Sequence, residues 1–328
     1  MIPVPRGMGV VVPGRLGVFI ARSCPRHVFR KVPGGDMNYD GLITIDSEIC
    51  RKDGLCVRIC PKVFTQAGPG SVPEVSRPEF CNDCGHCLLV CPVGAIRHRN
   101  LEGRAITEVE KDLLPSFRQV QEMVRARRSI RNFLDKPVER EMIEKVVDAA
   151  RFAPSAKNTQ STRFIAVDNG ETLRRIASMT AAWLGRSAKK LRNPLVRAVY
   201  LMRGLTTKEE YSRWIGQFEL TARNMEKGID TILYRAPALV LFHADRRVRF
   251  AEANANLALQ NATFAASALG LGTFYTGYVV SACAHDRAIP DMLGVPKGHR
   301  VYAGMTLGHV KIGFSRWIDR NPARIDWI

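Results

Sequence analysis

The feature that most constrains this chain is the crowding of its cysteines into one short segment. Seven of the nine cysteines lie between Cys50 and Cys91, and only Cys24 and Cys283 lie outside it. A disulfide-stapled secreted domain would spread its cysteines along the chain. The crowding instead indicates metal ligands, and it favours a reducing, cytoplasmic compartment. We expect Cys283 to be a buried small apolar residue and Cys24 an unstructured thiol.

The second half of this segment has the spacing C-x2-C-x2-C-x3-C-P, with its cysteines at Cys81, Cys84, Cys87 and Cys91. In two-cluster ferredoxins the fourth cysteine of such a run ligates the other cluster. The segment therefore resembles the bacterial two-cluster ferredoxins. Zinc is the alternative occupant, but zinc sites use C-x2-C pairs and not interlocked runs that end in Cys-Pro.

The first half has the same spacing with one substitution, because Asp53 stands where the second cysteine is expected. By position, the resemblance implies a complete set for one [4Fe–4S] cluster: Cys60, Cys81, Cys84 and Cys87. The other set is Cys50, Cys56 and Cys91, with Asp53 as a candidate fourth ligand. A carboxylate is a harder ligand than a thiolate. The second cluster is therefore either an oxygen-ligated [4Fe–4S] or a [3Fe–4S], and we favour a [4Fe–4S] that loses iron readily in air.

The formal net charge of +18 is spread unevenly. Residues 37–105 carry eight basic and eight acidic residues, so the whole excess lies in the flanking segments. Such an excess suits nucleic acid, a membrane surface, or an anionic cofactor or partner. No nucleic-acid motif accompanies it, so we expect no nucleic-acid partner. We favour phosphate-bearing cofactors and an acidic redox protein, with a merely solvated basic surface as the alternative.

The composition changes along the chain predict four segments. Residues 1–36 are rich in Pro, Gly and Arg, and we interpret them as an unstructured extension, with Met37 as the functional start. Residues 37–105 form the ferredoxin-like module. Residues 106–126 read as a linker that runs into a helix, and residues 127–328 as a second, α+β domain. No apolar run is long enough to span a membrane.

Hydrophobic patterning in the second domain predicts alternating helices and strands. Helices are expected over Glu139–Ala150 and Ala251–Leu269. Short buried strands are expected over Arg163–Val167, Ala238–His243 and Val301–Leu307.

Two segments near the start of this domain carry side chains suited to a phosphate-bearing cofactor. The first segment contains Arg127, Arg128, Ser129 and Arg131. Arginine is always charged and binds phosphate through a rigid fork of donors. The second segment contains Pro154, Ser155, Asn158 and Gln160. Its amide side chains donate and accept hydrogen bonds at once, as the polar edge of a heterocyclic ring requires.

Two later segments complete the pattern. Gly277 ends a glycine-rich stretch after the long helix, and glycine lets backbone come close to a planar ring. Arg316 and Arg320 follow the last strand near the C-terminus. Taken in this order, the four segments resemble the FMN-dependent nitroreductase family over about residues 120–328.

That resemblance implies a three-layer α+β fold and an intertwined homodimer with two FMN sites at its interface. It assigns the FMN phosphate to the Arg127 segment and to Arg316 or Arg320. The Pro154–Gln160 loop would contact the flavin ring and chain, and the backbone N–H near Gly277 would approach flavin N5.

The chemistry implied is that of the flavin, and we assign no catalytic side chain because no Ser/His/Asp or Cys/His arrangement is found. Electrons from the clusters or from NAD(P)H would reduce a small electron-poor acceptor, nitroaromatic or quinone-like. Two alternatives stay open, namely another reductive reaction such as dehalogenation, and a non-enzymatic relay between redox proteins. Residues 181–204 mix basic and apolar side chains, and we favour a lid or interface over membrane contact.

Overall fold

The computed structural model describes residues 38–328. The expected N-terminal extension, the Met37 start and Cys24 lie outside the described residues. Within the described part of the chain, no helix is both long and apolar enough to cross a bilayer.

The cysteine-rich module is built from two similar halves. Strand β1 (Ile43–Ile45) pairs with β4 (Ile96–His98), and β2 (Phe64–Thr65) pairs with β3 (Glu74–Val75), both antiparallel. Each half contributes one short helix, α1 (Leu55–Ile59) or α2 (His86–Val90).

A glycine in the left-handed region precedes each of these helices, Gly54 with φ 67° and Gly85 with φ 74°. The chain can therefore turn tightly between successive cysteines. A small core that includes Leu42, Val63 and Phe64 lies beneath the helices.

Helix α3 (Phe117–Ala126) lies in the chain between the module and the second domain. Its start is fixed by a capping box, in which Ser116 and Gln119 satisfy each other's backbone N–H groups. None of its residues is buried, and Phe117 and Val124 are exposed.

The second domain contains an antiparallel four-stranded sheet in the order β5-β6-β8-β7. The strands are β5 (Arg163–Val167), β6 (Ala238–Asp245), β7 (Leu271–Gly272) and β8 (His299–His309). The prediction for β5 is confirmed to the residue, whereas β6 and β8 run further than the sequence predicted.

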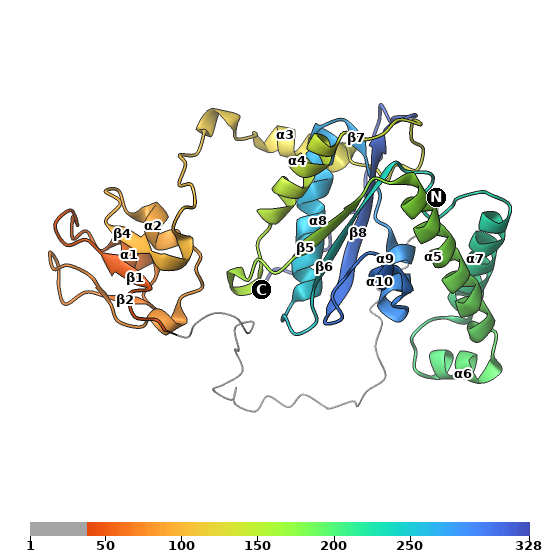
Figure 1. Cartoon of the computed structure of the whole chain (residues 1–328), viewed down its shortest axis with the longest axis horizontal. Coiled ribbons are helices and arrows are strands. Elements are labelled where there is room, and N and C mark those ends of the chain that lie inside the picture. Colours follow the sequence, from red (N-terminus) through yellow and green to blue (C-terminus); the bar gives the residue numbers. More distant parts are fainter. Residues whose placement is uncertain (1–37) are drawn as a thin grey trace. The chain divides into compact units, whose positions relative to one another are not determined.

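Helices cover both faces of this sheet, as Figure 1 shows. Helices α4 (Arg140–Arg151) and α8 (Ala251–Ala268) pack on one face. Helices α5 (Gly170–Leu191) and α9 (Gly277–His285) pack on the other, with α10 (Ala288–Met292) beside them. The predicted α+β, three-layer architecture is confirmed.

The burial of strand β6 on both faces explains why its sequence does not alternate between apolar and polar residues. Its residues Val240 and Phe242 contact the α4–α8 side, whereas Leu239 and Leu241 contact the α5–α9 side. A strand buried on both faces reads as one continuous apolar run.

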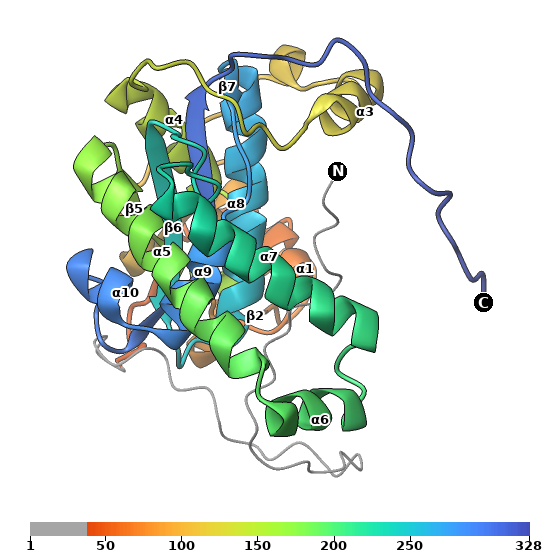
Figure 2. The same cartoon turned by 90° about the vertical axis from the view of Figure 1, so that its right-hand side faces the viewer.

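Helices α5 and α7 (Lys208–Glu226) lie side by side, and α6 (Pro194–Met202) lies at their far end (Figure 2). Pro194 is the first residue of α6, where its missing N–H costs no hydrogen bond. No residue of α6 is buried, and Leu195 and Met202 are strongly exposed. The lid or interface role of this region stays a prediction.

Candidate cofactor sites

The Asp53 half of the module has a cavity lined by all four residues of the predicted ligand set. Cys50, Asp53, Cys56 and Cys91 share its wall with apolar groups that include Ile45 and Ala95. One carboxylate oxygen of Asp53 accepts a hydrogen bond from the Leu55 N–H at 3.0 Å. The other oxygen is not used by that bond, so the carboxylate can bind iron without leaving its turn. These residues fit a cluster that is bound by three thiolates and one carboxylate.

The second predicted set also converges. Burial, together with the nearby Cys81, Cys84 and Cys60, raises the pKa of the Cys87 thiol to about 12. Burial likewise raises the pKa of Cys81, to which Cys84 and Cys60 add. Four thiols that influence one another in this way fit one cubane. Because each thiol must lose its proton to bind iron, cluster assembly releases protons.

In the second domain, three arginines predicted for the phosphate site come together. Burial lowers the pKa of Arg127, and the charges of Arg320 and Arg128 lower it further. Within residues 38–328, none of the three is ion-paired to a carboxylate. Crowded guanidinium groups without a counter-charge repel one another, so the site favours an anion. These residues fit the phosphate of FMN, and Arg320 is the C-terminal arginine whose charge acts on Arg127.

The C-terminal segment after β8 is held against the Arg127 segment by Asn132. Its side-chain oxygen accepts from the Ile312 N–H at 2.8 Å, and its carbonyl accepts from the Lys311 N–H at 3.3 Å. Two arginines then stack on aromatic rings of that segment, Arg125 on Trp317 at 4.7 Å and Arg128 on Phe314 at 5.8 Å.

The other members of the Arg127 segment contact the turn that follows β7. The Ile130 N–H donates to the Thr273 carbonyl at 2.9 Å, and Ser129 forms a bridge with Thr273. The Arg131 guanidinium lies 5.4 Å from the centre of the Phe274 ring. Phe274 is buried and belongs to the core, whereas Tyr275 is 44% exposed and can line a pocket.

The Pro154–Gln160 loop has an unusual backbone. Lys157, Asn158 and Gln160 have φ values of 55°, 52° and 45°, in the left-handed region that side chains other than glycine rarely adopt. The loop stays in place because the Gln160 N–H donates to Ser155 Oγ at 3.0 Å. Buried Asn254 of α8 also accepts from the Ala156 N–H at 3.1 Å. Strained backbone supported in this way is typical of binding loops.

Asn158 links this loop to the cysteine-rich module. Its Nδ2 donates to the carbonyl oxygens of Asp83 at 2.8 Å and Asn82 at 3.3 Å, between Cys81 and Cys84. Its Oδ1 accepts from Gln160 Nε2 at 3.1 Å. The predicted roles of Asn158 and Gln160 in flavin binding stay predictions.

Gly277 opens helix α9 at the middle of β8. The preceding Thr276 donates its N–H to the Gly304 carbonyl at 2.9 Å. A Cβ on Gly304 would lie 2.6 Å from Thr276 Oγ1 and 2.8 Å from Leu241. The close approach of α9 to the sheet therefore requires glycine at position 304.

The structure separates the predicted flavin segments into two groups along β8. Arg163, which follows the Pro154–Gln160 loop, pairs with His243, whose partner in β8 is Val301. The Arg127 segment instead lies beside β7, which pairs with His309. Eight residues of strand separate these two points of β8, which is roughly 26 Å. One chain alone does not bring the loop to the arginines.

Sequence reasoning missed three residues that shape these sites, namely His98, Asn132 and Asn254. Their partners are distant in sequence, up to 180 residues for Asn132 and Ile312. A signal was present only for Asn254, a polar residue within an otherwise Ala-rich helical stretch.

The profile of the nitroreductase family matches residues 124–309, and that of a 4Fe–4S dicluster domain matches residues 42–92. A nitrobenzene nitroreductase of Ectopseudomonas oleovorans is 29% identical over 205 residues, which cover 60% of this chain and 88% of that protein. A 7Fe ferredoxin of Hydrogenibacillus schlegelii is 41% identical over 49 residues, which cover 15% of this chain and 60% of that protein.

Among solved structures, a nitroreductase with bound FMN from Bacteroides fragilis is 22% identical to this chain. It has a TM-score of 0.45, with 64% of this chain and 97% of that chain covered.

Proposed function

Because this chain belongs to the nitroreductase family and carries a 4Fe–4S dicluster domain, we propose that it passes electrons between iron–sulfur clusters and FMN to reduce a small electron-poor acceptor. It is an FMN-dependent oxidoreductase. When bound, FMN supplies hydride and single-electron chemistry, so the protein has to position the groups and set their electrostatics. The observation that carries the proposal is the pair of hydrogen bonds from Asn158 to the Cys81–Cys84 loop.

The proposed acceptor class is nitroaromatic or quinone-like. It is supported by the relative that is named as a nitrobenzene nitroreductase. The exposed Tyr275, which directly precedes the Thr276–Gly277 turn, offers a flat surface for an aromatic acceptor. Arginines gathered at Arg127 hold the phosphate end of the cofactor and attract anionic groups.

The proposed electron donor is NAD(P)H or an acidic redox protein. The basic excess of the chain lies outside residues 37–105 and favours encounter with a negatively charged partner.

We assign one [4Fe–4S] cluster to Cys60, Cys81, Cys84 and Cys87, and the other cluster to Cys50, Cys56, Cys91 and Asp53. The second cluster is proposed as a [4Fe–4S] that converts readily to [3Fe–4S]. A relative named as a 7Fe ferredoxin supports a seven-iron form.

A homodimer is proposed as the working form. Its support is the separation of the Arg127 segment from the Pro154–Gln160 loop along β8. A second copy can supply the loop that a single chain does not bring to its own arginines.

The test is anaerobic purification followed by analysis of FMN, iron and acid-labile sulfide per chain, and then turnover assays. We expect one FMN per chain, seven or eight irons, and steady reduction of a nitroaromatic or a quinone with NAD(P)H or a reduced redox protein. A cluster-replete protein that reduces no small acceptor but passes electrons to another redox protein would establish the relay instead. Zinc in place of iron and sulfide would overturn the assignment of both clusters.

A further inference from the structure

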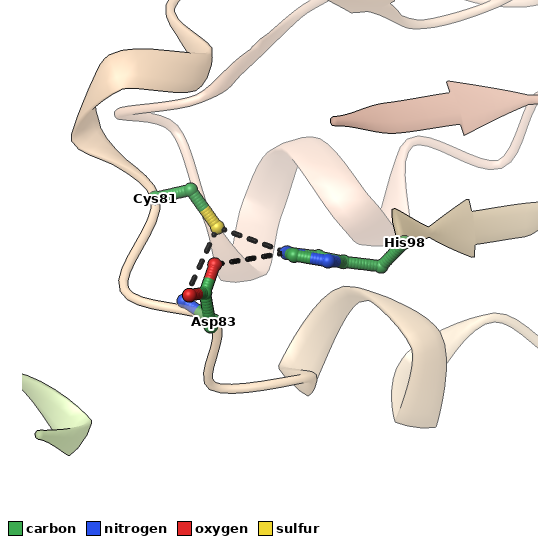
Figure 3. Close-up of side chains that lie close together, drawn as sticks. All are labelled: Cys81, Asp83 and His98. Atoms are coloured by element: carbon green, nitrogen blue, oxygen red, sulfur yellow. Dashed lines mark hydrogen bonds and ion pairs between the residues drawn. The ribbon is translucent and has the colours of Figure 1, made fainter. Parts of the chain in front are cut away.

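His98 lies against a predicted cluster ligand without belonging to the ligand sets. It is the last residue of β4, opposite Ile43 of β1, and it is only 2% exposed. Its Nε2 lies 3.3 Å from Cys81 Sγ and 3.4 Å from Asp83 Oδ1 (Figure 3). One ring nitrogen therefore faces a sulfur and a carboxylate at the same time.

The potential ligand atoms of Cys81, Asp83 and His98 lie within 4.8 Å of one another, close enough to hold a single metal ion. The spacing of the cysteine run argues for a different role. Cys81 is the first thiolate of a complete cubane set, and that set needs no histidine. His98 is then a neighbour of the cluster ligand, and side chains that touch a metal ligand from behind usually hydrogen-bond to it.

The two halves of the module differ at this point. In both halves, the first cysteine sulfur accepts a hydrogen bond from the backbone N–H of the residue two positions later. The Lys52 N–H donates to Cys50 Sγ at 3.4 Å, and the Asp83 N–H donates to Cys81 Sγ at 3.3 Å. His98 adds a side-chain nitrogen to Cys81 alone. Within residues 38–328 no side-chain donor reaches Cys50. The cluster at Cys81 therefore has a buried side-chain donor on its first ligand, whereas the second donor of the Asp53 set is a backbone group, the Ala95 N–H at 3.3 Å from Cys91 Sγ.

We propose that His98 carries its ring proton on Nε2 and donates it to the Cys81 thiolate, which raises the reduction potential of the cluster at Cys60, Cys81, Cys84 and Cys87. Reduction adds negative charge to the cluster and its sulfurs. An N–H aimed at a ligand sulfur therefore stabilises the reduced cluster more than the oxidised one. Burial of His98 keeps water from replacing that bond.

This inference rests on the proposed function, because it needs the cluster assignment made there. It adds a direction to the electron path. The tuned cluster is the one whose Cys81–Cys84 loop accepts the hydrogen bonds of Asn158. A higher potential at this cluster favours the presence of the electron beside the loop predicted to contact the flavin.

The test is a redox titration of the full-length, cluster-replete protein, followed by electron paramagnetic resonance so that the two clusters are read separately. His98→Leu removes the donor, and His98→Gln keeps an N–H at a similar distance from the sulfur. Ile43→Val, in the strand partner of His98, is the matched control for a small change in the core. Iron, sulfide and zinc are measured for every variant.

In His98→Leu we expect the ratio of reduced to oxidised Cys81 cluster at the wild-type midpoint to fall by on the order of ten-fold. The Asp53 cluster should keep its midpoint, His98→Gln should recover most of the loss, and Ile43→Val should behave as wild type. An unchanged midpoint in His98→Leu with both clusters intact overturns the role of His98, as does an equal shift of both clusters. Loss of one bound metal ion, without loss of sulfide, in both His98 variants would identify His98 as a ligand. Wild-type protein without iron and sulfide would refute the cluster assignment itself.

Discussion

Asp53 is the residue at which the two clusters differ most, because it offers oxygen where every other predicted ligand offers sulfur. Its carboxylate is already held by the Leu55 N–H, so it sits at the cavity wall before any metal binds. An oxygen-ligated iron in a sulfur-rich site is held less firmly than the other irons. The number of irons in this cluster should therefore depend on which ligand atom the side chain at position 53 provides.

We predict a graded series at this position. Asp53→Cys should give a [4Fe–4S] cluster that survives exposure to air, because it restores a fourth thiolate. Asp53→Asn should give mostly [3Fe–4S] even after Fe²⁺ and reductant are added, because a neutral amide is a poor iron ligand. Electron paramagnetic resonance of the oxidised protein measures the three-iron form directly.

The control for this series is Asp46→Asn. Asp46 also accepts a nearby backbone N–H, from Glu48 at 3.0 Å, but it does not line the cavity. It should leave both clusters as in wild type. If Asp53→Asn keeps its fourth iron as well as wild type does, Asp53 is not a ligand.

The predictability of single residues depends on whether their partners are local. The cysteines and Asp53 were predicted as ligands because metal ligands in ferredoxins follow a fixed local spacing. His98 was not identified because its partner Cys81 is 17 residues away and no spacing rule joins them. The residues of the Pro154–Gln160 loop were predicted to contact the flavin, but their support by Asn254 was not predicted.

At the level of elements, the sheet was the most predictable part of the second domain. The apolar runs at Arg163–Val167 and Ala238–His243 predicted β5 and β6. The run in β6 is continuous because helices cover both of its faces. The last strand was predicted too short. Its first residues, His299 and Arg300, are polar, and they join the sheet because β6 continues opposite them.

That extra length of sheet contains a histidine pair of which one member, His243, is buried. His243 of β6 and His299 of β8 lie with their Nδ1 atoms 3.0 Å apart. Burial, together with the charges of His299 and Arg163, lowers the pKa of His243 to about 4. His243 is therefore neutral in the folded protein at pH 5, where an unfolded histidine with a pKa of roughly 6.5 is protonated.

We predict that this pair costs stability in mild acid. Between about pH 6.5 and pH 4 the unfolded chain binds one more proton at residue 243 than the folded chain. The free energy of unfolding is thus fully retained above this window and falls as the pH drops through it. From pH 7 to pH 5 the loss from this residue is about 2 kcal/mol. Urea denaturation at the two pH values measures it.

His243→Gln should reduce that loss, because glutamine does not titrate in this range. His285→Gln is the control, since His285 is exposed on α9 and its partner there is the Ser281 carbonyl. Both variants keep the clusters, so acid damage to the clusters is common to all three proteins. A pH dependence as steep in His243→Gln as in wild type would contradict the assignment to this residue.

At the scale of the whole molecule, the order of the four predicted flavin segments along the chain could be read from the sequence, but their arrangement in space could not. A linear sequence places Arg127, Ser155, Gly277 and Arg320 in succession and suggests one site. Only the pairing of β5, β6 and β8 reveals that the loop and the arginines lie at opposite ends of a long strand. The resemblance to a dimeric family anticipated an interface site, but composition and periodicity carried no sign of it.

If each flavin site takes its arginines from one chain and its loop from the other, two defective chains should complement each other. Arg127→Gln weakens the phosphate site, and Gln160→Ala weakens the loop. Each homodimer should lose FMN affinity by on the order of ten-fold or more, as expected for losing a hydrogen bond to a charged group.

In the mixed dimer, one site combines both defects and the other combines the two intact segments. Co-expression with two different tags isolates that mixed dimer, and fluorescence titration should find half of its sites with wild-type affinity. Two equally weakened sites in the mixed dimer would mean that the loop and the arginines of one site belong to the same chain. Arg324→Gln, four residues beyond Arg320, is the matched control: paired with Gln160→Ala, it should leave one wild-type-like site whether the loop and the arginines come from one chain or from two.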